Sequence, residues 1–181
     1  DNEENAIKRF VEWFGDCPMV AHNAKFDVSF LEMAYKKYNL GTFTNPVIKA
    51  DRGFADVTVW NDSKDYYLLS TGSFEKSTIY NSKDLVNWTD TGIKIVDKQT
   101  LNDIKTLLIH SGLSDHGMFW APQVVNIKGK WNLYLALENK GGIIVLQSNC
   151  STGPFRFVGE PKILISNQMM GWNYDAIDPF V

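Results

Sequence analysis

Two runs of β-forming residues flank a polar turn in the stretch FADVTVWNDSKDYYLLST, residues 54–71. Apolar and polar residues roughly alternate through Ala55, Val57 and Val59, which predicts a strand. The residues at 61–65 are Asn, Asp, Ser and Lys, the types that favour turns, and a second β-rich run follows at 66–70. Together these features predict a β-hairpin.

Asp56 is an unusual residue for the interior of the first predicted strand. Strand interiors are depleted in Asp, and a charge on a buried face is costly without a partner. Asp56 therefore lies either on a solvated face or in a position where it is held for chemistry. A second carboxylate of this kind, Asp178, occurs in DAIDPFV at residues 175–181. Their separation corresponds to roughly two propeller repeats of about 40–50 residues, plus insertions.

The segments after the hairpin repeat the same alternation of predicted strands and turns. The first unit is completed by strands expected at 76–82 and 91–96, and the second contains strands expected at 119–125, 131–137, 141–148 and 155–158. A polar connection with a helical turn at 101–108 is expected between the units, and a third unit begins at Asp175. This loose period of about 55–65 residues is typical of β-propellers with insertions.

The first forty residues follow a different pattern. Apolar residues at helical spacing predict an amphipathic helix that ends at Gly15, then a short buried strand at 18–21, then a second helix that ends at Gly41. This helix–strand–helix order is typical of an α/β sheet. The helical periodicity stops near residues 44–48, so the chain is predicted to contain two unlike parts.

Composition limits the classes of function. The net charge of −3 and the pI near 5.6 give no general attraction for nucleic acid, so we consider a nucleic-acid partner unfavoured. Cys17 and Cys150 suggest two free, mostly buried thiols rather than a disulfide framework. No apolar run has the length of a membrane span, and the first residues lack the apolar core of a signal peptide. Compartment and oligomeric state stay open, and the missing initiator Met suggests a piece of a longer chain.

The turn before the second helix carries VAHNAKFDVSFL, residues 20–31. This sequence resembles the second motif of DEDD-type 3′–5′ exonucleases, most closely the proofreading domain of a class of bacterial replicative DNA polymerase. The resemblance implies that Asp27 helps to hold two divalent metals, Mg²⁺ or Mn²⁺, and that His22 and Asn23 shape the turn. The other two metal-binding motifs of that family are absent. Asp27 is otherwise a carboxylate favoured by the helix dipole, and 3′ trimming of single-stranded DNA is the corresponding alternative function.

The remaining motifs, in order FADVTVW, DYYLLST, SKDLVNW, FWAPQVV, STGPF and AIDPFV, resemble the N-terminal part of glycoside hydrolase family 43. That family consists of five-bladed β-propellers that cleave arabinosyl or xylosyl linkages of plant polysaccharides with inversion. The resemblance implies that Asp56 is the general base, although Val57 replaces the usual Pro. It implies that Asp178 orients the general acid and tunes its pKa. No cofactor is implied for this part.

The general acid of the family is a Glu in a later blade, beyond Val181. We therefore expect weak or no turnover by these 181 residues. Glu160 is interpreted as a surface residue rather than a substitute for the acid. Trp120 is a candidate for stacking on a sugar, although a core position fits it nearly as well. Trp88 is interpreted as a core residue and His116 as part of a loop or pocket lining.

The sequence thus predicts a mainly β chain with two parts. Residues 1–44 form a short α/β exonuclease-like fragment, and residues 45–181 form about two blades of a partial five-bladed propeller that takes a pentose-containing glycan. A non-catalytic carbohydrate-binding remnant is a third alternative. The tetrapeptide NPVI at 45–48 fits both families, so the junction is either a genuine fusion or an artefact of assembly. The particular sugar, its linkage, and exo or endo action stay open.

Overall fold

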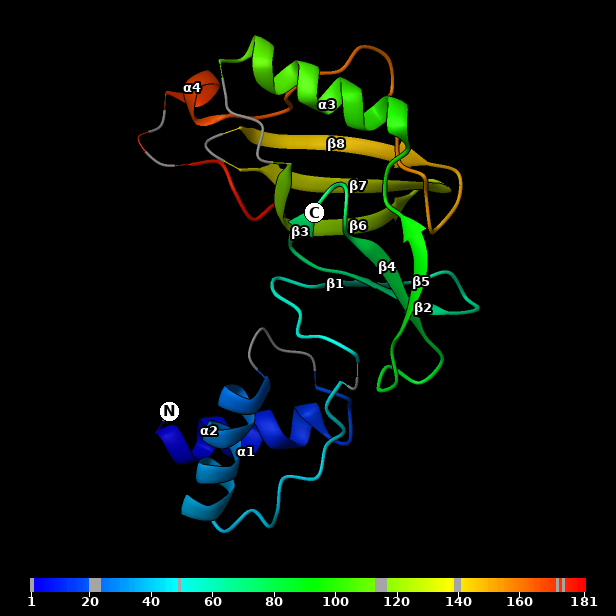
Figure 1. Cartoon of the computed structure of the whole chain (residues 1–181). Coiled ribbons are helices and arrows are strands. Elements are labelled where there is room, and N and C mark those ends of the chain that lie inside the picture. The colour runs from blue at the N-terminus through cyan, green and yellow to red at the C-terminus, as the bar shows by residue number, and fades with distance from the viewer. Residues whose placement is uncertain are drawn as a thin grey trace.

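The computed structural model describes residues 2–19, 24–48, 50–112, 117–138, 141–171, 173 and 175–181. These residues form a mainly β unit and a smaller helical part (Figure 1). The helices are α1 (Glu3–Phe14), α2 (Ala24–Lys37), α3 (Lys98–His110) and α4 (Asn167–Met170). The strands are β1 (Thr58–Asn61), β2 (Tyr66–Leu69), β3 (Gly72–Ser73), β4 (Thr78–Ser82), β5 (Thr89–Lys94), β6 (Met118–Ile127), β7 (Lys130–Leu137) and β8 (Gly142–Ser148).

The first sheet contains the predicted hairpin. Its strand order is β1-β2-β4-β5, with antiparallel neighbours, and Thr58 pairs with Leu69 in the hairpin register. The expectation that Asp56 lies inside the first strand was wrong. β1 begins only at Thr58, because Asp56 has a positive φ of 46°, which is incompatible with an extended strand. Asp56 is therefore at the point where the chain bends into the sheet.

The buried face of β1 is set by Thr58 and Trp60, which are 5% and 6% exposed. The apolar residue between them, Val59, faces outward. The Thr58 hydroxyl is accommodated because it accepts a hydrogen bond from the backbone N–H of Val124 in β6, at 3.2 Å. This bond places β1 beside β6 of the second sheet.

The second sheet has the order β3-β6-β7-β8, again with antiparallel neighbours. β6 and β7 are joined at Lys128 and Gly129, which both have positive φ, as a tight two-residue hairpin turn requires. The strand expected at 155–158 is reduced to a single bridge between Gln147 and Arg156.

The main core lies between the two sheets and includes part of α3. Its largest fully buried members are mostly aliphatic, with two Phe rings, Phe119 and Phe155. Phe119 in β6 lies 4.9 Å from the ring of Phe74, measured between centroids. A smaller cluster of Leu68, Tyr80 and Trp88 occupies a second site, packed against residues 48–57, and it confirms Trp88 as a core residue.

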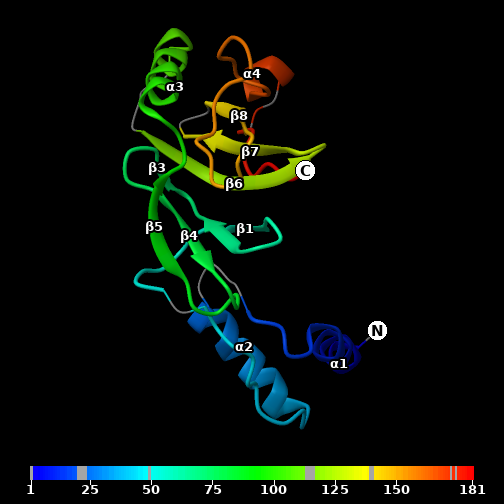
Figure 2. The same ribbon diagram turned by 90° about the vertical axis from the view of Figure 1, so that its right-hand side faces the viewer.

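Helix α3 is longer than the helical turn expected at 101–108. Asp97 caps it, since the Asp97 side chain accepts a hydrogen bond from the N–H of Thr100 at 2.9 Å. Ile104 and Leu108 lie one turn apart and are buried in the core. The capping Asp and this spacing were the available signals in the sequence. α3 lies at the end of the β unit remote from α1 and α2 (Figures 1 and 2).

The two helices predicted in the N-terminal part are present. α1 ends at Gly15 as predicted, but α2 ends at Lys37, and Asn39 rather than Gly41 takes the first positive φ after it, 54°. Of the strand expected at 18–21, residues 20 and 21 lie outside the described residues, and Met19 forms only an isolated parallel bridge with Val47. The Asn45 side-chain amide donates to the carbonyls of Gly15 and Cys17 at 2.6 and 3.0 Å. The junction segment is therefore bonded to the helical part.

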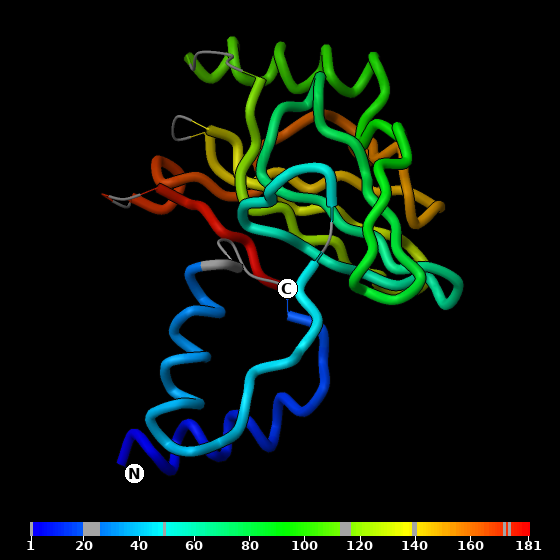
Figure 3. Tube along the Cα trace, turned by 60° about the horizontal axis from the view of Figure 1, so that its bottom comes forward, coloured from blue at the N-terminus to red at the C-terminus, as the bar shows by residue number. Residues whose placement is uncertain are grey.

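Residues 175–181, where a third unit was expected to begin, contain no strand. This segment, red in Figures 1–3, ends beside β6 and β7. None of the described helices has the length and apolar character that crossing a membrane requires.

Candidate active site

Asp56 is exposed and directly precedes the first sheet. Its side chain is held by Thr71, whose hydroxyl donates to Asp56 Oδ2 at 2.8 Å. The backbone N–H of Thr71 also donates to the carbonyl of Ala55 at 2.9 Å. Asp56 is therefore fixed through both its own side chain and the backbone of its neighbour.

Thr71 lies where the chain crosses from one sheet to the other. β2 of the first sheet ends at Leu69, and β3 of the second sheet begins at Gly72. The Thr71 Oγ1 accepts a hydrogen bond from the N–H of Ala121 in β6, at 2.9 Å. One hydroxyl group thus joins Asp56 to the second sheet. Thr71 was not recognised as a site residue from sequence, because its two side-chain partners are remote from it along the chain.

The same backbone conformation recurs at three related places. Asp56, Ala121 and Asp178 have φ values of 46°, 40° and 53°. Each stands second in a short motif: Ala-Asp-Val, Trp-Ala-Pro and Ile-Asp-Pro. A non-glycine residue in the left-handed region costs about 1–2 kcal/mol, so a repeated case indicates a repeated structural requirement. Asp178 is exposed, like Asp56, and it lies in the C-terminal segment.

Trp120 precedes Ala121 and is half-buried. It pairs with Ala136 of β7, and the β6–β7 register shifts between Trp120 and Gln123. Such a bulge bends the strand and redirects the side chains around it. The structure therefore joins Asp56, through Thr71, to the residue that follows Trp120.

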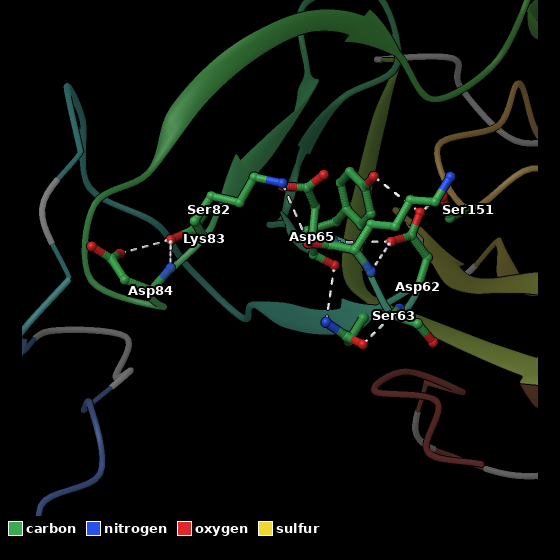
Figure 4. Close-up of polar contacts among 10 residues, drawn as sticks. Asp62, Ser63, Asp65, Ser82, Lys83, Asp84 and Ser151 are labelled. Carbon is green, nitrogen blue, oxygen red and sulfur yellow. Dashed lines mark hydrogen bonds and ion pairs between the residues drawn. The ribbon is translucent and has the colours of Figure 1, made fainter.

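Other carboxylates in the β unit serve turns. Asp62, in the β1–β2 turn, accepts hydrogen bonds from the N–H groups of Lys64 and Asp65, both at 3.1 Å (Figure 4). Its second oxygen accepts from the hydroxyls of Tyr67 at 3.1 Å and Ser151 at 2.8 Å. Burial alone would raise the pKa of Asp62, but these donors outweigh it and lower the pKa overall.

Asp84 and Asp65 also have local structural roles (Figure 4). Asp84 accepts from the N–H of Asn87 at 2.7 Å and from the Asn87 side-chain amide at 2.7 Å. These bonds, with one from the N–H of Val86, hold the pKa of Asp84 well below its ordinary value. Asp65 forms an ion pair with Lys83 at 2.6 Å, between exposed and partly exposed groups. Both carboxylates therefore have partners within the protein.

The exonuclease-like motif is only partly described. Asp27 lies in the first turn of α2, whereas His22 and Asn23 lie outside the described residues, as does His116. Within the residues that the structure describes, no three His, Cys, Asp or Glu side chains gather closely enough to hold a metal ion.

Two other expectations concern the surface. Cys17 and Cys150 are free thiols, but both are exposed, so the expectation of burial was wrong. Neither lies in a helix or a strand. Glu160 is exposed, as expected for a surface residue, and borders a cavity of about 220 Å³ beside β7 and β8.

Comparison with known sequences gives the family. The profile described as "Glycosyl hydrolases family 43" matches residues 43–181, which is most of the chain. The chain therefore belongs to glycoside hydrolase family 43. Asp56, Thr71, Trp120 and Asp178 all lie within the matched region.

The solved structures to which this chain is similar include three arabinan-degrading enzymes. Native arabinanase from Bacillus subtilis is 22% identical, with 59% of this chain and 37% of that chain covered and a TM-score of 0.47. The α-L-arabinanase from Cellvibrio cellulosa complexed with arabinohexaose is 25% identical, with 68% of this chain and 39% of that chain covered and a TM-score of 0.46. The endo-arabinase from Bacteroides thetaiotaomicron is 26% identical, with 69% of this chain and 41% of that chain covered and a TM-score of 0.48. The chain thus spans about two fifths of each of these proteins.

A short N-terminal segment has different relatives. It is 47% identical over 45 residues to a PolC-type DNA polymerase III from Bacillus cereus and 44% identical over the same length to that of Staphylococcus aureus. The match covers 25% of this chain but only 3% of each polymerase. The comparisons therefore match both resemblances noted in the sequence: one to glycoside hydrolase family 43 and one to a bacterial DNA polymerase.

Proposed function

We propose that residues 45–181 carry part of the active site of an inverting glycosidase that acts on arabinosyl or xylosyl linkages. The observation that supports this most strongly is the placement of Asp56. It is an exposed carboxylate held by a hydrogen bond from Thr71 at 2.8 Å. The resemblance of its motif to those of the family implies that it is the general base. The carboxylates Asp62 and Asp84 accept hydrogen bonds from the turns in which they lie.

In this proposal Asp56 accepts a proton from the water that attacks the anomeric carbon. An ionised carboxylate has about four lone-pair sites, so a hydrogen bond from Thr71 is compatible with binding that water. The bond also favours one orientation of the carboxylate, which keeps the accepting oxygen aimed at the water. Proton removal from the nucleophile as it attacks contributes typically 10²–10⁴-fold to the rate.

Asp178 has a different role in the proposal. A negative charge close to a carboxylic acid opposes its ionisation, so Asp178 keeps the general acid protonated until it donates to the leaving oxygen. Inversion requires the base and the acid to be about 6.5–9.5 Å apart, which leaves room for the water. The shared positive φ of Asp56 and Asp178 supports a similar presentation of the two carboxylates at the starts of their motifs.

Trp120 supplies the sugar platform. It is half-buried, lies at the bulge in β6, and is adjacent in sequence to the residue that donates to Thr71. An indole ring offers a large apolar face that can cover the C–H groups of a pentose. A central Trp of a binding site typically contributes about 2 kcal/mol or more to affinity.

The test is calorimetric titration with arabinohexaose and xylohexaose, followed by assay of reducing ends. We expect binding of one of these saccharides, and Trp120→Ala should weaken it about thirtyfold or more, which corresponds to about 2 kcal/mol. Trp13→Ala is the matched control, because Trp13 lies in α1 and is 80% exposed. Any turnover should be lost in Asp56→Asn.

Two results would change the proposal. Turnover that persists in Asp56→Asn would contradict the role proposed for Asp56 as the general base. Binding of neither saccharide, in a protein whose circular dichroism shows an intact β fold, would contradict the proposed substrate class.

A further inference from the structure

We propose that Thr71 is a positioning residue that fixes the Asp56 carboxylate and couples it to the second sheet. This inference rests on the proposed function insofar as Asp56 is the reacting group. The contacts themselves do not depend on that assignment. They are the bond from Thr71 Oγ1 to Asp56 Oδ2 at 2.8 Å and the bond from the Ala121 N–H to Thr71 Oγ1 at 2.9 Å.

The Thr71 hydroxyl is used in both directions. A hydroxyl has one proton to donate and two lone pairs that accept. Because the Ala121 N–H occupies an acceptor site, the remaining proton is directed elsewhere, and Asp56 is the acceptor that receives it. Threonine also has fewer accessible χ1 rotamers than serine, since it is branched at Cβ. Threonine therefore suits a relay, by which we mean the two consecutive hydrogen bonds from the Ala121 N–H to Thr71 Oγ1 and from the Thr71 hydroxyl to Asp56.

The backbone around Thr71 has close contacts on both sides. Before it, the Thr71 N–H is bonded to Ala55, the residue that precedes Asp56. After it, Gly72 is packed so tightly that a Cβ at this position would lie 2.2 Å from Ser77 Oγ. Gly72 also pairs with Phe119 of β6, whose side chain is fully buried. The hydroxyl is therefore held in place by the crossover and not only by its own bonds.

Ala121 completes the relay in an unexpected way. It stands at the position that corresponds to Asp56 and Asp178 and has the same positive φ, but it has no carboxylate. Its backbone N–H is used instead, as the donor to Thr71. A movement of the Trp120–Ala121 segment when a sugar binds would therefore reach Asp56 through a single side chain.

The experiment compares three substitutions in the full chain by NMR. Thr71→Val removes the hydroxyl and keeps the shape, and Thr71→Ser keeps the hydroxyl. Thr58→Val is the matched control, because Thr58 also accepts from a β6 N–H, that of Val124, but is not a partner of Asp56 in this relay. The measurements are the exchange rate of the Ala121 amide proton and the chemical shift of the Asp56 carboxyl carbon.

We expect Thr71→Val to raise the Ala121 exchange rate at least about tenfold and to move the Asp56 carboxyl signal, because each group loses its hydrogen bond with Thr71. Thr71→Ser and Thr58→Val should leave both values close to wild type. An unchanged Asp56 signal in Thr71→Val would overturn the proposal, and so would equal effects of Thr58→Val, since these would indicate general loosening.

Two further measurements keep the outcomes distinct. In the wild-type protein the side-chain couplings of Thr71 should report a single χ1 rotamer, and averaging among rotamers would overturn the proposal even if Thr71→Val did not fold. Titration with arabinohexaose then tests the function separately. If the Thr71→Val effects are as expected but no saccharide perturbs Asp56, the positioning role stands and the glycosidase proposal fails.

Discussion

The substitution Gly72→Ala tests the crossover that carries the candidate site. A Cβ on Gly72 would lie 2.2 Å from Ser77 Oγ, a separation that real Cβ atoms do not tolerate, and Ser77 is buried. Its next neighbours, Ser77 Cβ and the Ser70 carbonyl, would be at ordinary distances of 3.5 and 3.7 Å. The conflict is therefore confined to one oxygen atom.

This geometry gives a magnitude. Overpacking a tight site costs about 1–3 kcal/mol, so Gly72→Ala should lower the free energy of unfolding by about 2 kcal/mol. For a chain of this size that corresponds to a fall in Tm of about 4–8 °C. Ser77→Ala alone, which removes a buried hydroxyl, should cost about 1 kcal/mol. In the double variant the clash is absent, so its total cost should stay near 1 kcal/mol.

The assay is urea denaturation followed by circular dichroism for the two single variants and the double variant. The expected coupling energy is about 2 kcal/mol. Gly53→Ala is the matched control, because a Cβ there would meet no atom within 4 Å. Additive effects, giving a double variant about 3 kcal/mol less stable than wild type, would refute this description of the crossover.

Three further outcomes follow from the structure. Phe119→Ala should cost about 3–5 kcal/mol in urea denaturation, because Phe119 is fully buried between the sheets, whereas Phe180→Ala, at a ring that is 91% exposed, should cost less than about 0.5 kcal/mol; equal costs would contradict the core. Asp62→Asn should lower stability by about 1–2 kcal/mol near neutral pH. Folding lowers the pKa of Asp62, so its ionised side chain stabilises the folded protein above the unfolded pKa of about 4. This stabilisation is lost as the pH falls through the folded pKa. The denaturation curves of the variant and the wild type should therefore converge at acid pH. A gap that widened in acid would contradict the sign of this shift. Cys17 and Cys150 should both react with a thiol reagent in the native protein, and protection of either until unfolding would show that it is buried.

Much of the fold was predictable because it depends on local patterns. The hairpin of β1 and β2 follows from β-forming runs around an Asn- and Asp-rich turn, and it is present in the structure. The limits of β1 were not predictable. Residues 55–57 alternate like a strand, but the positive φ of Asp56 breaks the strand. In this conformation Asp56 accepts a hydrogen bond from Thr71, a residue that is not its neighbour in sequence.

The candidate site was predictable only in part. Asp56, Trp120 and Asp178 were recognised through motifs that resemble a family, and their proposed roles stay predictions. Thr71 was missed, because its significance lies in bonds to residues 15 and 50 positions away. The prediction that Cys17 and Cys150 are buried was wrong for a related reason. Free thiols generally prefer the interior, but this preference does not tell whether a particular cysteine is buried.

The most direct measurement of the central claim is a titration of the isotope-labelled protein with arabinohexaose and with xylohexaose, followed through assigned amide signals. If Asp56, Trp120 and Asp178 line one sugar-binding pocket, their amides and that of Ala121 should shift together with a common Kd for one of the two saccharides. Shifts confined to one of these segments, or centred instead on the β4–β5 face or on α1 and α2, would contradict the account.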